Sequence, residues 1–153
     1  MSATRKELEA YIGIKATQPS YKKALDKFME NPNKPIWCWT ALFPNMFWLC
    51  YRKCLTPAIV LMVTFFTANI LIPIQYSSYL LIGVLLVSGL FGMNIYLINA
   101  EKEIARIKDN NPSSNKKQIL ELISNKGGVS LNYALILYIV QVVLYSTIFK
   151  TAM

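Results

Sequence analysis

The sequence predicts an all-α integral membrane protein with three transmembrane helices, and three observations lead to this fold class. Of its 153 residues, 54% are hydrophobic and only 16% are charged, whereas a soluble domain averages about 25% charged residues. No charged residue occurs between Lys53 and Glu101, and a second uncharged, apolar run extends from Leu131 to Phe149. Because a helix needs about 20 apolar residues to cross a bilayer, the first interval fits two spans and the second fits one.

Residues 1–35 are predicted to form a helical cytoplasmic segment. Thr4 and Glu7 have the spacing of a capping box, which predicts a helix from about Arg5 to Ile12. A second helix is expected to follow Pro19 and to end near Glu30. We expect its apolar face to pack on a neighbouring helix rather than on lipid, since three residues share that face: Tyr21, Leu25 and Phe28. This polar stretch lacks the apolar region of a cleavable signal peptide, so we expect the internal spans to hold the chain in the membrane.

Residues 36–53 form the most aromatic part of the chain. Trp and Tyr concentrate at the lipid headgroup level, where an apolar ring and a polar tip are both solvated. The apolar run is short for a span, so we predict an interfacial or re-entrant helix, broken at Pro44-Asn45; a full extra span is the alternative. Six residues are predicted to anchor this segment at the membrane interface and to contact anionic lipid headgroups: Trp37, Trp39, Trp48, Tyr51, Arg52 and Lys53.

Residues 54–153 are predicted to form a three-span membrane domain. The expected spans are Leu55–Ile72, Tyr79–Ile98 and Leu131–Phe149. Between the second and third spans, residues 101–126 are predicted to form a cytoplasmic helical hairpin. Its first arm continues out of the second span, and its second arm has expected end residues that fit helix capping: Ser113 or Ser114 before it and Gly127 after it.

The distribution of Lys and Arg predicts the orientation of these spans. Nine basic residues precede the first span, none lies in the turn after it, six lie in residues 101–126, and only Lys150 follows the third span. Cytoplasmic loops carry the excess of basic residues in membrane proteins. We therefore expect the N-terminus in the cytoplasm and the C-terminus outside.

Small and polar residues gather on one part of the second span. Small residues let two helix backbones approach closely, and buried amides join helices by hydrogen bonds. Two interpretations remain open, internal packing of the three spans and a contact with another membrane subunit. The residues concerned are Gly83, Ser88, Gly89, Gly92 and Asn94.

A series of mostly aromatic, basic and glycine positions runs along roughly residues 10–131: Tyr11-Ile12-Gly13, Tyr21, Phe28, Trp37, Trp39, Ala41, Phe43, Trp48, Tyr51-Arg52-Lys53, Asn94, Tyr96 and Gly127-Gly128. The order of these residues resembles a bacterial membrane-protein family, domain of unknown function twenty-six-twenty-eight. The chain departs from the family pattern at Cys38, Pro44, Asn45 and Cys54. The resemblance implies a small protein of the bacterial inner membrane, and it implies no activity because the family has no established function.

Residues suited to catalysis or to metal binding are scarce in this sequence. There is no His, and the three Cys residues lack the spacing of a zinc site, so we expect structural thiols, no metal and no cofactor. The net charge of +8 would suit nucleic acid. The basic residues lie where membrane topology requires them, however, so we expect no nucleic-acid partner.

These observations favour a non-catalytic accessory or scaffolding subunit of a membrane complex, with other membrane subunits as its partners. The alternative is a small transporter or channel that acts as a homo-oligomer. Its polar groups at membrane depth would be Asn69, Asn94 and Gln141. A membrane enzyme or a nucleic-acid tether is the third and least supported interpretation.

Overall fold

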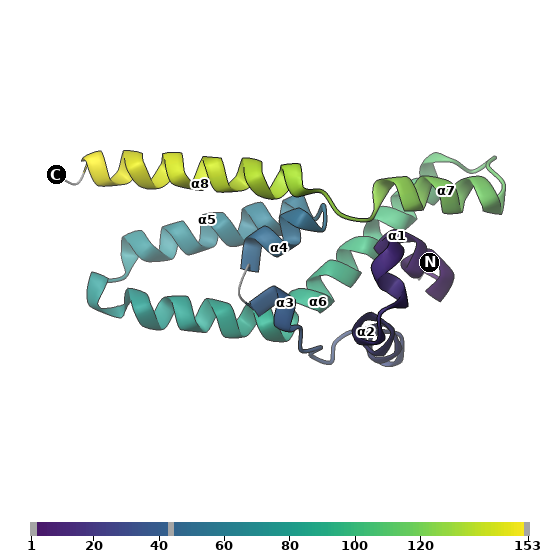
Figure 1. The fold of residues 1–153 in the computed structure, drawn as a ribbon, viewed down its shortest axis with the longest axis horizontal. Coiled ribbons are helices and arrows are strands. Elements are labelled where there is room, and N and C mark those ends of the chain that lie inside the picture. Colours follow the sequence, from purple (N-terminus) through teal and green to yellow (C-terminus); the bar gives the residue numbers. More distant parts are fainter. Residues whose placement is uncertain (1–2, 43–44, 152–153) are drawn as a thin grey trace.

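The computed structural model describes residues 3–42 and 45–151, and within these ranges the chain is helical and contains no strand (Figure 1). The prediction of an all-α chain is confirmed. In chain order the elements are α1 (Arg5–Ile12), η1 (Gly13–Thr17), α2 (Pro19–Glu30), α3 (Trp39–Leu42), α4 (Asn45–Tyr51), α5 (Leu55–Leu71), η2 (Ile74–Tyr76), α6 (Ser77–Asn110), α7 (Lys116–Lys126) and α8 (Leu131–Thr151).

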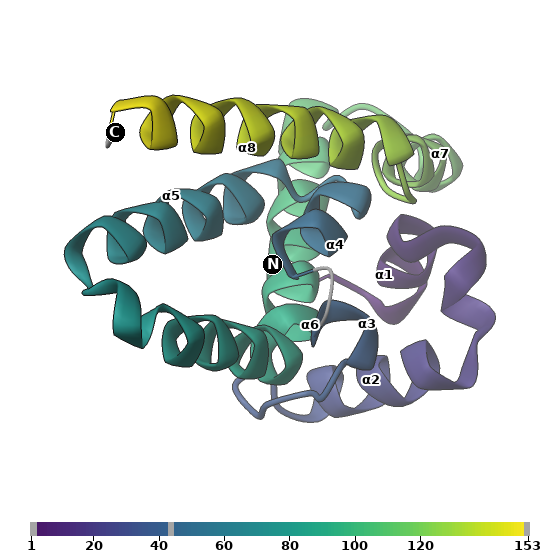
Figure 2. The ribbon, with the colours of Figure 1, turned by 60° about the vertical axis from the view of Figure 1, so that its left-hand side comes forward.

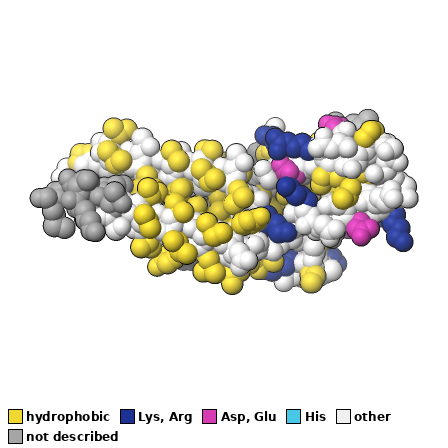
Figure 3. Space-filling model, turned by 90° about the horizontal axis from the view of Figure 1, so that it is seen from above, with side chains coloured by type: hydrophobic (Ala, Val, Ile, Leu, Met, Phe, Trp, Pro, Cys, Tyr) yellow, Lys and Arg dark blue, Asp and Glu magenta, His cyan; other side chains and the backbone are white. Residues whose placement is uncertain are grey.

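The molecule has an apolar end and a charged end. Helix α5 and the first half of α6 form an antiparallel hairpin that turns at η2, and α8 lies beside α5 (Figures 1 and 2). The rings of Phe66 and Tyr145 join α5 to α8, with centroids 5.0 Å apart. Helices α1, α2 and α7 gather at the other end with the second half of α6. Hydrophobic side chains cover the apolar end in Figure 3, whereas charged side chains gather at the opposite end.

Two helices, α6 and α8, are long and apolar enough to cross a membrane. Helix α5 is uncharged and apolar but has only 17 residues. In the most apolar 18-residue stretch of each long helix, the protein itself buries 39% of the residues in α6 and 11% in α8. Helix α8 therefore presents most of its apolar side chains to whatever surrounds the protein.

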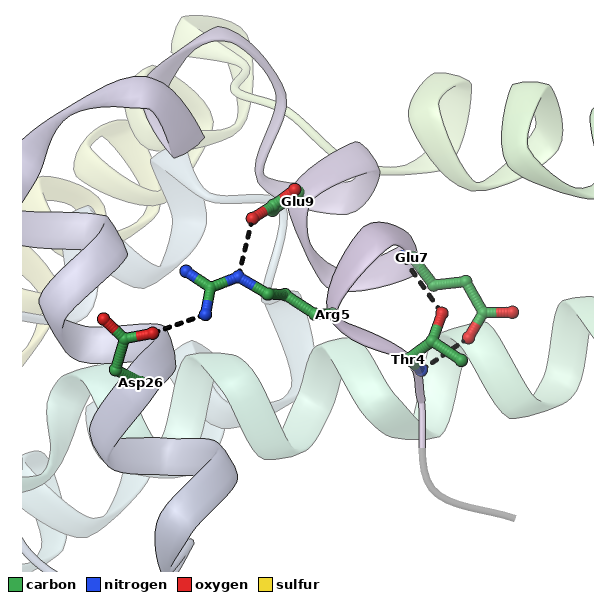
Figure 4. Close-up of polar contacts among 5 residues, drawn as sticks. All are labelled: Thr4, Arg5, Glu7, Glu9 and Asp26. Atoms are coloured by element: carbon green, nitrogen blue, oxygen red, sulfur yellow. Dashed lines mark hydrogen bonds and ion pairs between the residues drawn. The ribbon is translucent and has the colours of Figure 1, made fainter.

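The charged end begins with the predicted capping box. The Thr4 hydroxyl accepts a hydrogen bond from the Glu7 backbone N–H, and the Glu7 carboxylate accepts one from the Thr4 backbone N–H at 2.7 Å. Next to this cap, the Arg5 guanidinium pairs with Glu9 at 3.0 Å and with Asp26 of α2 (Figure 4). The first turn of α1 is thereby tied to both its own helix and α2.

A second ion pair joins α1 to α6. The Lys108 ammonium lies 2.6 Å from the Glu7 carboxylate, and both side chains are partly buried. Burial alone would raise the pKa of Glu7, but the hydrogen bonds from Lys108 and Thr4 outweigh it and hold the pKa below its ordinary value. The α1 helix is therefore joined to the long helix that continues into the apolar end.

The residue that caps the start of α7 lies just after Ser113 and Ser114, the two residues that were expected to cap it. Its N-cap is Asn115, whose side chain accepts from the Gln118 backbone N–H at 2.9 Å, while the Gln118 side chain accepts from the Asn115 backbone N–H at 3.0 Å. The expected caps Ser113 and Ser114 are wrong because only Asn115 has a residue three positions on that completes a capping box.

The end of α7 contacts the end of α1 through a close approach of the two backbones. The Gly128 backbone N–H donates to the Tyr11 carbonyl at 2.7 Å. A Cβ atom on Gly127 would lie 2.0 Å from that same carbonyl oxygen. Gly127 ends α7 as predicted, and it also lets two helix ends touch that are far apart in the sequence.

Candidate functional site at the aromatic segment

The aromatic segment contains two short helices, α3 and α4. Residues 43–44 between them lie outside the described residues, and so does Pro44, at which the break was predicted. Helix α3 packs on α6, and α4 packs among α5, α6 and α8 (Figure 2). The segment thus joins the three apolar helices, and α8 contacts the rest of the chain chiefly through α4.

Arg52 follows α4 directly, and its side chain has no exposed surface. Three aromatic rings surround the guanidinium, whose central carbon lies 4.6 Å from the ring centroid of Tyr21, 5.1 Å from that of Tyr96 and 6.0 Å from that of Trp48. These rings come from α2, α6 and α4. Attraction between a cation and the faces of aromatic rings partly replaces the water that the guanidinium loses on burial.

The positive charge of Arg52 has no acidic counterpart among the described residues. Its Nη1 donates a long, 3.5 Å hydrogen bond to the Ile12 carbonyl, while Nε and Nη2 have no hydrogen-bond partner within the described part of the chain. The buried Tyr96 hydroxyl also has no hydrogen-bond partner among the described residues. We call Arg52 and the three rings around it the Arg52 cage. A buried charge is costly unless it is paired and hydrogen-bonded. The cage therefore holds a positive charge that no described residue of the chain neutralises.

Tyr21 shows the effect of this environment on a neighbouring group. Burial raises the pKa of its phenol, and the positive charge of Arg52 opposes that shift. Beside it, the Lys15 ammonium lies 5.4 Å from the ring centroid of Tyr51. Two cations therefore lie close to the aromatic residues that connect η1, α2 and α4.

The six predicted interface residues separate into three pairs with different environments. Trp37 and Trp39 stack edge to face with centroids 5.0 Å apart and are 40% and 69% exposed. Trp48 and Arg52, in contrast, are buried. The headgroup contact expected for Arg52 does not fit this position, because the rings of Tyr21, Tyr96 and Trp48 enclose its side chain.

The two remaining residues of that set lie near the junction with α7 and α8. The Tyr51 carbonyl accepts a hydrogen bond from the Ser130 backbone N–H at 2.8 Å. Lys53 adopts a positive φ of 60° and donates to the Asn125 carbonyl at 3.4 Å. Both residues connect the aromatic segment to the end of α7.

The small residues of α6 lie mostly under α3 of the same chain. The Gly89 carbonyl accepts a hydrogen bond from the Cys38 backbone N–H at 2.8 Å. A Cβ atom on Gly92 would lie 2.7 Å from that of Ala41, so only glycine permits this contact. Ser88 is buried beside them, whereas a Cβ on Gly83 would meet nothing within 4 Å.

Asn94 holds the linker that leads from α2 to α3. Its side-chain amide donates to the carbonyls of Pro32 and Lys34 at 2.8 Å each, and its oxygen accepts from the Ile36 backbone N–H at 3.0 Å. The sequence indicates an amide that joins helices. The structure shows instead an amide that makes three hydrogen bonds to backbone groups of the linker.

Two of the three amides proposed for a pore are engaged within the chain. Asn94 binds the linker, and the Asn69 amide donates to the Phe65 carbonyl at 2.8 Å within its own helix. The Gln141 side-chain oxygen is buried and has no hydrogen-bond partner within residues 3–42 and 45–151. The pore alternative stays a prediction, with little polar surface left to support it.

The cysteines and the acidic residues do not gather into a ligand set. All three Cys side chains are buried and free, and Cys54 accepts a 3.3 Å hydrogen bond from Asn99. Within the described ranges no three His, Cys, Asp or Glu side chains come together in a way that could hold a metal ion.

Sequence reasoning missed Lys15 and Tyr96 as parts of this site, and it assigned Tyr21 only to a packing face. No local signal marks them, because Lys15 lies in the short helix η1 and Tyr96 lies in the interior of the long helix α6, far from Arg52 in the sequence. Comparison of the chain with protein-family models, curated proteins and solved structures finds no match. The resemblance to domain of unknown function twenty-six-twenty-eight therefore stays a prediction.

Proposed function

We propose that this protein is an integral membrane protein with three spans, α5, the first half of α6 and α8, and that it acts as a non-catalytic accessory or scaffolding subunit of a membrane complex. The helices α1, α2 and α7 form its cytoplasmic part. The aromatic segment lies at the cytoplasmic membrane surface and connects the two parts.

The lengths of the helices are compatible with three spans. At about 1.5 Å per residue, the 17 residues of α5 extend about 26 Å, close to the hydrocarbon thickness of about 30 Å. Its side chains at Ile59, Val60 and Val63 are 47%, 59% and 55% exposed. Apolar side chains with this exposure are compatible with lipid and unfavourable in water.

The arrangement of the helix ends supports one orientation of the chain across the membrane. The turn at η2 and the C-terminal end of α8 lie at one end of the molecule, and α7 lies at the other with the N-terminal helices (Figure 1). The end that holds α7 carries almost all the basic residues. By the positive-inside rule, this end faces the cytoplasm.

The observation that carries the subunit proposal is the outward face of α8. Ile139 and Val143, one turn apart, are 60% and 56% exposed, and they lie on the side of α8 opposite to Leu137, which is buried against the chain. A helix that is apolar all round and covered on one side only is typical of a chain that packs against further helices or lipid. The small protein buries little of this helix itself, so we assign the outward face to a partner subunit.

The test is co-purification in a mild detergent, followed by measurement of the intact mass. The proposal expects a stable assembly that contains one 17.4 kDa chain with different subunits. Substituting Ile139→Ala together with Val143→Ala removes side-chain volume from the outward face of α8. We expect this double variant to lose most of the partner, at least tenfold, while it remains in the membrane fraction.

A matched control is available on α5. Ile59→Ala with Val63→Ala removes the same atoms at the same spacing from a similarly exposed surface. The control is expected to retain the partner. A monomer of the unaltered protein, or equal loss in both double variants, would contradict the assignment to α8. A homo-oligomer would favour the alternative of a small transporter or channel.

A further inference from the structure

A pocket of about 610 Å³ opens between η1 and α2 on one side and the aromatic segment on the other. The side chains that matter for its chemistry are those of Lys15, Tyr21, Trp37, Trp39, Trp48 and Tyr51. Among the described residues that line it there is no Asp or Glu. The pocket thus offers a cation, several hydrogen-bond donors and aromatic faces, with no acidic residue to repel an anion.

The buried Arg52 adds a second positive charge next to this pocket. Its guanidinium packs on the rings of Tyr21 and Trp48, and both rings also line the pocket. The charge is not neutralised by an acidic residue in the described part of the chain. Electrostatic attraction is stronger in a partly buried site than in water, because the effective dielectric constant is lower. An anion in the pocket would therefore be attracted by both Lys15 and Arg52.

The position of the pocket indicates where such an anion would come from. Trp37 and Trp39 line it and are 40% and 69% exposed. Half-exposed Trp side chains next to apolar helices are typical of the headgroup level of a bilayer. Backbone contacts of the neighbouring Cys38 with Gly89 place these residues beside the apolar half of α6.

We propose that this pocket binds the phosphate headgroup of an anionic phospholipid, with Lys15 at the phosphate and the aromatic side chains around the glycerol. This inference rests on the proposed membrane location. A single bound lipid would supply the anion that the Arg52 cage lacks, and it would fix the aromatic segment against the membrane surface. Lys15 then contacts the headgroup directly. Arg52 does not touch the headgroup but attracts it electrostatically from behind the rings of Tyr21 and Trp48.

The three Trp residues of the chain all line the pocket, so intrinsic fluorescence reports on it directly. The experiment titrates the purified full chain, in a non-ionic detergent, with short-chain phosphatidylglycerol, short-chain phosphatidylcholine and inorganic phosphate. We expect a saturable change in Trp emission with phosphatidylglycerol, with an apparent affinity about tenfold higher than for the zwitterionic lipid. A basic residue near an anionic lipid contributes about 1 kcal/mol, so Lys15→Gln should weaken the binding about fivefold.

Lys23→Gln is the matched control, because Lys23 is exposed on α2 and does not line the pocket. It is expected to bind phosphatidylglycerol like the unaltered chain. An equal response to inorganic phosphate and to phosphatidylglycerol would support the anion site and assign its ligand to soluble phosphate. The proposal is overturned by three results: no saturable change, equal affinity for the two lipids, or equal loss in both Lys variants. The titration uses the isolated chain, so its outcome does not depend on whether a partner subunit co-purifies.

Discussion

Gly127→Ala is expected to lower the thermal unfolding temperature of the purified protein by about 10 °C. The added Cβ would lie 2.0 Å from the Tyr11 carbonyl oxygen and 2.8 Å from its Cα. Both atoms belong to the backbone, so neither can turn aside, and the ends of α1 and α7 must separate. Overpacking of this kind costs about 3 kcal/mol or more, and for a chain of this size each kcal/mol shifts Tm by about 2–4 °C.

The control for this effect is Gly83→Ala in α6. No atom lies within 4 Å of the Cβ that this substitution adds, and Gly83 is in the interior of a long helix. Alanine is favoured over glycine there by up to about 1 kcal/mol. Gly83→Ala should therefore leave Tm unchanged or raise it slightly. If Gly127→Ala were as stable as Gly83→Ala, the close approach of α7 to Tyr11 would be absent from the folded protein.

Asn94→Ala is expected to release the linker between α2 and α3. It removes one acceptor from the Ile36 N–H and two donors from the Pro32 and Lys34 carbonyls. An unsatisfied buried polar group costs about 1–3 kcal/mol, so we expect a loss of about 3 kcal/mol in total. The measurement is Tm combined with limited proteolysis, which should cut the linker at residues 31–38 much faster than in the unaltered protein.

Two further variants separate lost hydrogen bonds from lost volume. Asn94→Asp preserves the shape and the acceptor but removes both donors and faces a carboxylate toward two carbonyls. It should be at least as damaging as Asn94→Ala. Asn69→Ala removes one amide that bonds only within its own helix, and it should cost about 1 kcal/mol or less. Equal protease resistance of Asn94→Ala and Asn69→Ala would show that the linker is held by other contacts.

Local sequence signals predicted the elements of this fold because their causes lie within a few residues. The capping box at Thr4 and Glu7 fixed the start of α1, and Gly127 marked the end of α7. The apolar faces of Tyr21, Leu25 and Phe28 are buried as the helical spacing predicts. Helical periodicity also predicted that α6 continues beyond the apolar run, to about Lys108, and the helix ends two residues later at Asn110.

The candidate site could not be predicted in the same way, because its contacts join distant parts of the chain. Arg52 next to Lys53 and an aromatic run has the local pattern of a basic residue that reaches headgroups. Its burial depends on Tyr21 and Tyr96, which approach it only when α2 and α6 pack together. Asn94 likewise binds a linker that no periodic pattern places beside it. Spacing within one helix cannot reveal such partners.

The central claim is that the helices α5, α6 and α8 cross a membrane and that α7 lies in the cytoplasm. The most direct measurement is labelling of single-cysteine variants in intact cells with a thiol reagent that does not cross membranes. Gln75 and Lys116 are both exposed and lie at opposite ends of the molecule, whereas the native Cys side chains are buried. The account predicts that Gln75→Cys is labelled from outside and that Lys116→Cys is labelled only after the membrane is opened. Labelling of Lys116→Cys in intact cells, or failure of Gln75→Cys to react, would contradict it.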